Sequence, residues 1–182
     1  MSPLEQYRVL ARYNRWMNRK LFALAGGLED VVRKRDLGAF FGSVHGTLNH
    51  LLLADRAWLF RITKDGERYA SKTVAGEPIL ITGLRHELYA DFDVLHRERE
   101  RTDEDLLEWI YGLDEAALDG TIDYTTTSGE PQSHVLWWAV GHLFNHQTHH
   151  RGQLTTLLSQ LGLDPGVTDL LAMCREETIP TR

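Results

Sequence analysis

The chain has 182 residues, 42% hydrophobic and 25% charged, which is typical of one ordinary globular domain spanning residues 1–182. The formal net charge of −6 argues against a nucleic-acid surface and against a binder of anionic membranes, since both depend on basic patches. The single cysteine, Cys174, excludes an internal disulfide framework, and no apolar signal segment is found within residues 1–20, so we expect a cytoplasmic protein.

The first predicted helix begins at Pro3, with Ser2 as its N-cap. Proline suits the first helical position, because its missing N–H would have no helical partner there. Apolar residues then recur every three or four positions from Leu10 to Leu24, which is the spacing of one helical face. The pair Gly26-Gly27 predicts the end of this helix.

The second predicted helix runs from Ser43 to the segment Lys64-Asp65-Gly66, and its apolar residues follow the same spacing. Residues 67–83 contain glycine, proline and scattered charges, which predicts a long connection after this helix. The third predicted helix spans Leu84 to Leu113.

The middle of the third predicted helix, residues 97–105, is almost wholly charged. We interpret this stretch as a solvated face rather than a binding surface. Thr102–Asp105 resembles a capping box, which would allow a break in the helix. The apolar register from Leu88 to Leu113 persists across the stretch and therefore favours one continuous helix.

The last third of the chain predicts a short β-hairpin and two further helices. Residues 124–131 are rich in β-branched side chains around a Ser-Gly turn, which indicates the hairpin. A fourth long helix follows Ser133 and ends at Gly162, and after the turn Asp164-Pro165-Gly166 a short last helix is predicted at Asp169–Arg175. Four long amphipathic helices with a long second connection predict an all-α fold, a four-helix bundle.

The nine histidines fall into groups that their neighbours distinguish. In the fourth predicted helix, His142, His146 and His150 are spaced by four, so they lie along one helical face. A row of three at this spacing is expected only about 0.02 times by chance in a chain with this many histidines. Four others lie near helix ends or among polar residues and are interpreted as surface residues: His45, His86, His96 and His134.

The spacing of four suits a metal ion. Residues four apart in a helix have Cβ atoms roughly 5–6 Å apart, and two imidazole nitrogens on one zinc ion lie roughly 3.4 Å from each other. Buried imidazoles need partners, so a row of them facing a core forms either a metal site or an internal hydrogen-bonded network. A third ligand should come from another helix. His50, in the apolar stretch Leu48–Leu53, is the best candidate, although a core histidine fits that position as well.

Two segments carry a resemblance to a known family. Asn-His-Leu-Leu-Leu-Ala-Asp at 49–55 and Phe-Asn-His-Gln-Thr-His-His-Arg-Gly-Gln at 144–153 resemble the signature segments of the DinB/YfiT-like superfamily. This is the damage-inducible DinB family of helical-bundle, metal-dependent proteins, unrelated to the DNA polymerase of similar name. The resemblance covers nearly the whole chain and implies a divalent-metal site formed by His50, His146 and His150.

The resemblance also implies roles for neighbouring residues and partners. His149 is expected not to bind the metal, and His142 is a supporting residue or an alternative ligand. Neutral imidazoles suit zinc or nickel, with iron or manganese as alternatives. We expect a small-molecule substrate, a low-molecular-weight thiol as a second cofactor and a homodimer, with no nucleic-acid or membrane partner.

Three functions agree with a three-histidine site, which leaves a coordination position open. The first is a metal-dependent thiol S-transferase, in which Arg151 could hold a carboxylate or could be a surface arginine at the bundle rim. The second is a metal-dependent hydrolase, although no base like the glutamate of a His-Glu-x-x-His motif is evident. The third is a non-enzymatic, metal-binding stress protein. His142 and Arg151 are the candidate catalytic residues.

Overall fold

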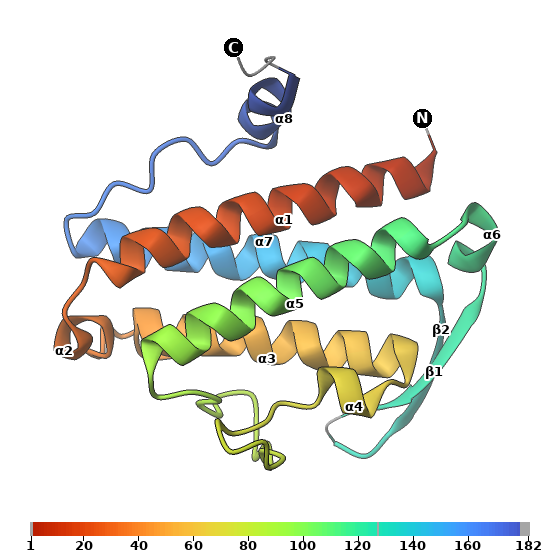
Figure 1. The fold of residues 1–182 in the computed structure, drawn as a ribbon, viewed down its shortest axis with the longest axis horizontal. Helices are drawn as coiled ribbons and strands as arrows, with labels where there is room; N and C mark the ends of the chain where they lie inside the picture. The colour runs from red at the N-terminus through yellow and green to blue at the C-terminus, as the bar shows by residue number, and fades with distance from the viewer. Residues whose placement is uncertain (1, 127, 179–182) are drawn as a thin grey trace.

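Four long helices lie side by side as a bundle: α1 (Pro3–Gly26), α3 (Val44–Thr63), α5 (Phe92–Gly112) and α7 (Leu136–Gln160) (Figure 1). The computed structural model describes residues 2–126 and 128–178. Helix α1 packs against α5 and α7, and α3 packs against the same two helices. The predicted all-helical bundle is therefore confirmed.

The long second connection follows from the helix directions. Helices α1 and α7 run one way, and α3 and α5 run the other way (Figure 1). Because α3 and α5 are roughly parallel, the chain must return along the full length of the bundle between them. This return, between Thr63 and Phe92, contains the short helix α4 (Gly66–Tyr69).

Short elements complete the described chain. Strands β1 (Thr121–Thr125) and β2 (Pro131–Val135) pair antiparallel, with Thr121 opposite Val135, so the predicted hairpin is confirmed. Thr127, which belongs to the predicted hairpin segment 124–131, lies outside the described residues. Helix α8 (Leu170–Thr178) matches the short last helix. Three short helices were not predicted: α4, α2 (Asp30–Arg33) and α6 (Glu115–Leu118).

Side-chain caps explain where the first two long helices begin. The Ser2 hydroxyl accepts a hydrogen bond from the Glu5 N–H, and the Ser43 hydroxyl accepts one from the Gly46 N–H. Helix α3 ends at Thr63. Its C-cap, Lys64, has a left-handed φ of 61°, a conformation that glycine more often adopts at a helix end.

The predicted start of the third long helix at Leu84 is wrong, because α5 begins at Phe92. Asp91 is its N-cap and accepts a hydrogen bond from the Val94 N–H at 2.9 Å. Before it, the Asn49 side chain accepts from the Tyr89 N–H and donates to the Tyr89 carbonyl. These bonds hold the segment non-helical while Leu88 remains buried. From its true start, α5 is continuous across the charged stretch, as predicted.

The interpretation of residues 97–105 as a solvated face is wrong for three of them. Arg99, Thr102 and Asp103 are each at most 2% exposed. They form part of a buried polar layer that separates two apolar clusters of the core. The layer contains residues from all four long helices: Asn14, Asn18, Asp55, Arg99, Thr102, Asp103, Gln147 and Arg151.

Hydrogen bonds and opposite charges stabilise this buried polar layer. Arg99 donates to Asp55 at 2.7 Å and to Asp103 at 2.8 Å. Asn18 donates to Asp103, and Gln147 donates to Asp55. Two buried cations, Arg99 and Arg151, thus balance two buried carboxylates, as buried charges require.

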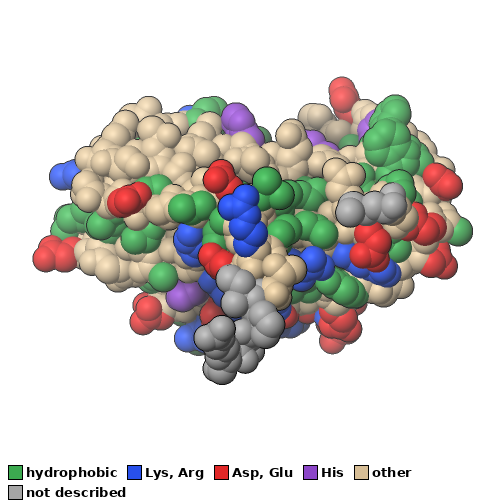
Figure 2. Space-filling view, turned by 90° about the horizontal axis from the view of Figure 1, so that it is seen from above, with side chains coloured by type: hydrophobic (Ala, Val, Ile, Leu, Met, Phe, Trp, Pro, Cys, Tyr) green, Lys and Arg blue, Asp and Glu red, His purple; other side chains and the backbone are tan. Residues whose placement is uncertain are grey.

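The outer surface of the bundle carries many charged side chains. Acidic and basic side chains are intermixed on the face that α1 and α8 form (Figure 2). Exposed pairs such as Arg15–Glu104 and Arg12–Glu177 connect neighbouring helices there. Within residues 2–126 and 128–178, no helix is both long enough and apolar enough to cross a membrane.

Candidate metal centre

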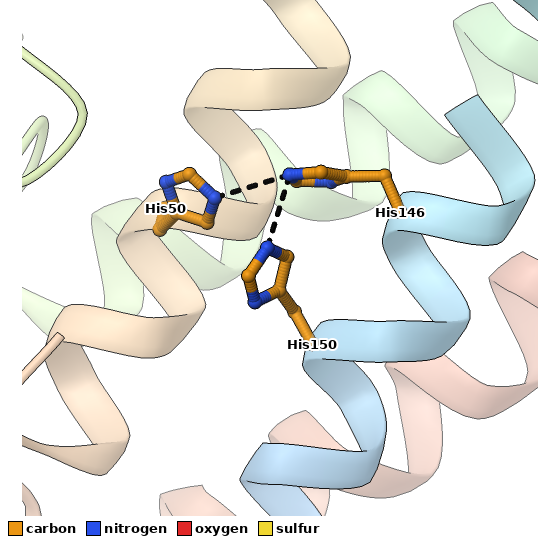
Figure 3. A group of neighbouring side chains, drawn as sticks. All are labelled: His50, His146 and His150. Atoms are coloured by element: carbon orange, nitrogen blue, oxygen red, sulfur yellow. Dashed lines mark hydrogen bonds between the residues drawn. The ribbon is translucent and has the colours of Figure 1, made fainter. Parts of the chain in front are cut away.

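Three histidine rings meet between α3 and α7, beside the buried polar layer. His50 comes from α3, and His146 and His150 come from successive turns of α7 (Figure 3). The Nε2 atom of His146 lies 3.2 Å from Nε2 of His50 and 3.0 Å from Nε2 of His150. The structure thus brings together the three residues that the sequence analysis selected, with one nitrogen of each within 4.8 Å of the others.

The cluster is largely buried. His50 is 3% exposed and His150 is 9% exposed, while His146 is partly buried. The ring of Phe41 stacks on His50 with centroids 3.8 Å apart and meets the edge of His150 at 5.3 Å. Phe41 therefore forms an apolar wall against two of the three imidazoles.

Two hydrogen bonds fix which nitrogen of each ring carries the proton. His50 Nδ1 lies 3.0 Å from the Leu84 carbonyl, and His150 Nδ1 lies 2.8 Å from the Gln153 side-chain oxygen. Both partners are acceptors, so each Nδ1 carries a hydrogen and donates. The Nε2 atoms of His50 and His150 are then bare lone pairs that point towards His146.

This arrangement fits a cation better than a hydrogen-bonded network. A neutral His146 ring has at most one hydrogen on Nε2, so it can satisfy only one of the two lone pairs that face it. A single cation between the three nitrogens would satisfy all of them. The spacings of 3.0 and 3.2 Å are close to the roughly 3.4 Å expected around tetrahedral zinc.

The electrostatics also favour neutral, ligand-ready rings. Burial lowers the pKa of His50 to about 4, with the neighbouring His150 as a smaller cause. Burial and the adjacent histidines lower the pKa of His146 to about 3, and burial lowers the pKa of His150. Metal ions bind the neutral imidazole, so these rings need not lose a proton to bind one near neutral pH.

His142, the supporting residue or alternative ligand of the sequence analysis, lies at the edge of this cluster. Its side chain is exposed, and its ring centroid is 5.8 Å from that of His146 and 4.9 Å from that of Trp58. It is not among the three residues whose nitrogens converge. His149 is exposed and points to Gln153 instead.

Arg151 lies in the core, so its interpretation as a surface arginine is wrong. It is 4% exposed and donates to the Asn14 side-chain oxygen and to the Thr148 hydroxyl. Its guanidinium also lies 5.2 Å from the Tyr13 ring. These contacts direct it towards α1, so it does not reach a substrate at the histidines.

The expectation that His45 is a surface residue is also wrong, because its side chain is fully buried. Its Nε2 lies 2.9 Å from the Tyr89 carbonyl, and burial lowers its pKa. The other three histidines interpreted as surface residues, His86, His96 and His134, are partly exposed.

Sequence reasoning missed three groups that shape the site. The Leu84 carbonyl comes from the long connection, where no sequence pattern indicates its position. Phe41 likewise lies in a loop before α3. Gln153 could have been found, because it lies three residues after His150 and therefore on the same side of α7.

Comparisons with known proteins agree with this picture. The model of the DinB family matches residues 1–181. The chain is 23% identical over 161 residues to Protein DinB of Bacillus subtilis (strain 168), an alignment that covers 88% of each chain. The similarity therefore extends over all four long helices and both segments that carry the histidine cluster.

Proposed function

Because the chain belongs to the DinB family, we propose that it is a metal-dependent enzyme that transfers a small-molecule thiol to an electrophile. His50, His146 and His150 would hold one divalent cation, zinc or nickel in the first instance. The observation that carries this proposal is the convergence of three Nε2 atoms from two helices. When bound, such a cation supplies a Lewis acid that lowers the pKa of a thiol.

The protein's own residues prepare the cation site and control its surroundings. Leu84 and Gln153 hold the rings of His50 and His150 in the tautomer that presents Nε2. Phe41 covers one side of the cluster and limits the access of water. His142 lies close enough to exchange a proton with a substrate that rests against His146.

Thiol transfer agrees better with these groups than hydrolysis does. A thiol has an ordinary pKa near 8.5 and needs little help to become a nucleophile, whereas water needs a base. Within the described residues, no carboxylate joins the three-histidine group. Asp55, the acidic residue of the first signature segment, has both oxygens hydrogen-bonded, to Gln147 and Arg99.

Metal binding is the first test. We expect dialysis against zinc, followed by elemental analysis, to give one ion per chain. His150→Ala should lose at least ten-fold in zinc affinity, because one of three ligands is removed. His149→Ala is the matched control, since it removes the neighbouring exposed imidazole and should leave the affinity unchanged. Equal affinities in the two variants would contradict the proposed site.

Activity is the second test. Zinc- and nickel-loaded protein is incubated with monochlorobimane and a panel of cellular thiols, so that the thiol sulfur displaces chloride. We expect turnover that requires both thiol and metal and is lost in His150→Ala but not in His149→Ala. Cleavage of esters without thiol would instead favour the hydrolase, and metal binding without either activity would favour the non-enzymatic alternative.

We further propose that the protein acts as a homodimer in the cytoplasm. The support is the resemblance to the family, together with exposed aromatic side chains at the start of α7, where Trp137 and Trp138 are 47% and 54% exposed. Light scattering after size-exclusion chromatography should give twice the chain mass. A monomer at micromolar concentration would contradict the dimer without affecting the metal site.

A further inference from the structure

A second site lies along α3 from the histidines, at the end of the bundle where α4 and the hairpin meet (Figure 1). There an open cavity of about 930 Å³ is lined by the end of α3, α4, the connection around Ile79 and both strands. The volume lies within the range of pockets that hold small molecules.

The walls of this cavity are largely apolar and partly aromatic. Phe60, Ile79, Ile81 and Tyr124 contribute to them. Phe60 is 46% exposed and Ile81 is 43% exposed, although both are large apolar side chains. Removing such surface from water is favourable, so the walls suit a ligand with a flat apolar body.

The charged residues of the cavity are mainly basic, in a chain that is acidic overall. Three cations line it, Arg56, Arg61 and Lys64, against one carboxylate, that of Asp123. Arg56 is already paired with Glu98, and Lys64 donates to the Asp123 backbone carbonyl. The cavity therefore has positive charge in excess of its acidic groups.

Of the three cations, Arg61 has neither an acidic partner in the described part of the chain nor the backbone carbonyl that Lys64 contacts. Within the described residues it makes no ion pair, and its guanidinium lies 4.9 Å from the Trp58 ring and 5.3 Å from the Tyr124 ring. Partial burial lowers its pKa, as expected for a cation that has lost water and gained no anion. The planar guanidinium offers two parallel N–H donors, which match a carboxylate.

We propose that this cavity binds a small aromatic carboxylate, whose ring packs between Phe60 and Tyr124 and whose carboxylate pairs with Arg61. With Arg56 paired to Glu98, the cations Arg61 and Lys64 exceed the one carboxylate, that of Asp123, by a single charge, which a monoanion matches. The binding requires no metal, because none of the three clustered histidines lines the cavity.

The cavity lies on the same face of α3 as His50 of the metal centre. Ala57 and Arg61 follow His50 by seven and eleven residues, close to two and three helical turns, so all three share one face of α3. At 1.5 Å per residue they lie about 10 and 16 Å along the helix from His50. The connection that carries Ile79 and Ile81 also supplies the Leu84 carbonyl that fixes His50. A role for this ligand as part of the enzyme's substrate rests on the proposed function. The binding of the ligand to the cavity does not depend on that function.

The test uses metal-free full-length protein and titration calorimetry with two probes, 1-naphthoate and its neutral analogue 1-naphthamide. We expect naphthoate to bind at least ten-fold more tightly than naphthamide. Arg61→Gln should remove this difference, whereas Arg97→Gln, an exposed arginine on α5 outside the cavity, should keep it. Ala57→Phe, which fills the cavity beside Arg61, should weaken both probes.

Three outcomes would overturn the inference. These are no binding of naphthoate, equal affinity for the two probes, or the same naphthoate affinity in Arg61→Gln and Arg97→Gln. Circular dichroism checks that each variant is folded, and Ala57→Phe serves as the test should Arg61→Gln be unfolded. Because the titration omits metal, a failed metal site would leave this result unchanged.

Discussion

Replacing Arg99 by methionine should strongly destabilise the protein, because it removes the central cation of the buried polar layer. Arg99 is 1% exposed and donates to Asp55 and Asp103, which are 1% and 2% exposed. Methionine has a similar length but no charge, so both carboxylates would remain buried without their shared cation.

The size of the effect follows from these two bonds. A hydrogen bond to a charged group contributes about 1.5–3 kcal/mol, so two such bonds together contribute about 3–6 kcal/mol. This agrees with the loss of about 3–5 kcal/mol seen when one partner of a buried ion pair is removed. Asp103 retains its bond from Asn18, and burial already raises its pKa, so protonation would relieve part of the cost. We therefore expect a loss of about 3–4 kcal/mol at pH 7.

Urea denaturation of the metal-free protein, followed by circular dichroism at one protein concentration, measures this loss. The control is Arg15→Met, since Arg15 pairs with Glu104 on the surface at 2.9 Å and should contribute less than about 1 kcal/mol. The deficit of Arg99→Met should shrink towards pH 4, where carboxylates gain protons. A deficit below about 1 kcal/mol, equal to that of Arg15→Met, would refute the reasoning.

Three further predictions test the site, the buried histidines and a helix start. Gln153→Leu should weaken zinc binding by about 10–100-fold, because His150 Nδ1 loses its hydrogen-bond acceptor. The control Gln160→Leu, at the exposed end of α7, should leave zinc affinity unchanged when both are measured by competition with a zinc indicator. The metal-free protein should lose stability as the pH falls from 6.5 towards 4, by at most about 1.4 kcal/mol per pH unit for each histidine. The reason is that histidines of the unfolded chain take up protons in this pH range, while burial lowers the pKa of His50 in the folded protein to about 4. A free energy of unfolding that is constant from pH 7 to pH 5 would contradict this prediction. Asp91→Ala should cost about 1 kcal/mol in thermal or urea unfolding, through loss of the α5 N-cap, and no change would argue against that cap.

The sequence predicted well what depends on local spacing. The histidines of α7 could be selected from the sequence, because their four-residue spacing is a property of one helix. The start of α5 was misplaced because Leu88 fits the helical register, but the next residue, Tyr89, is held outside the helix by the side chain of Asn49, forty residues earlier. The role of the Leu84 carbonyl could not be predicted for the same reason, because it depends on a contact between segments that are distant in the sequence.

The buried polar layer was missed although the apolar register contained a signal for it. If the register that runs through Leu95 and Leu106 continues across the charged stretch, positions 99, 102 and 103 fall on the core face. A continuous helix and a wholly solvated middle were therefore incompatible predictions. Continuity was correct, and it required that Arg99 and Asp103 be buried and paired.

The polar layer and the histidine cluster are consequences of the same short segment of α7. Each of the two clustered histidines of α7 is followed by a residue of the buried polar layer, since Gln147 follows His146 and Arg151 follows His150. Successive helical residues differ by about 100° around the axis. The rotation that buries Gln147 against Asp55 and Arg151 against Asn14 therefore turns the two imidazoles towards α3. The layer fixes the direction in which the histidines point, and His50 completes the cluster because α3 packs against that side of α7.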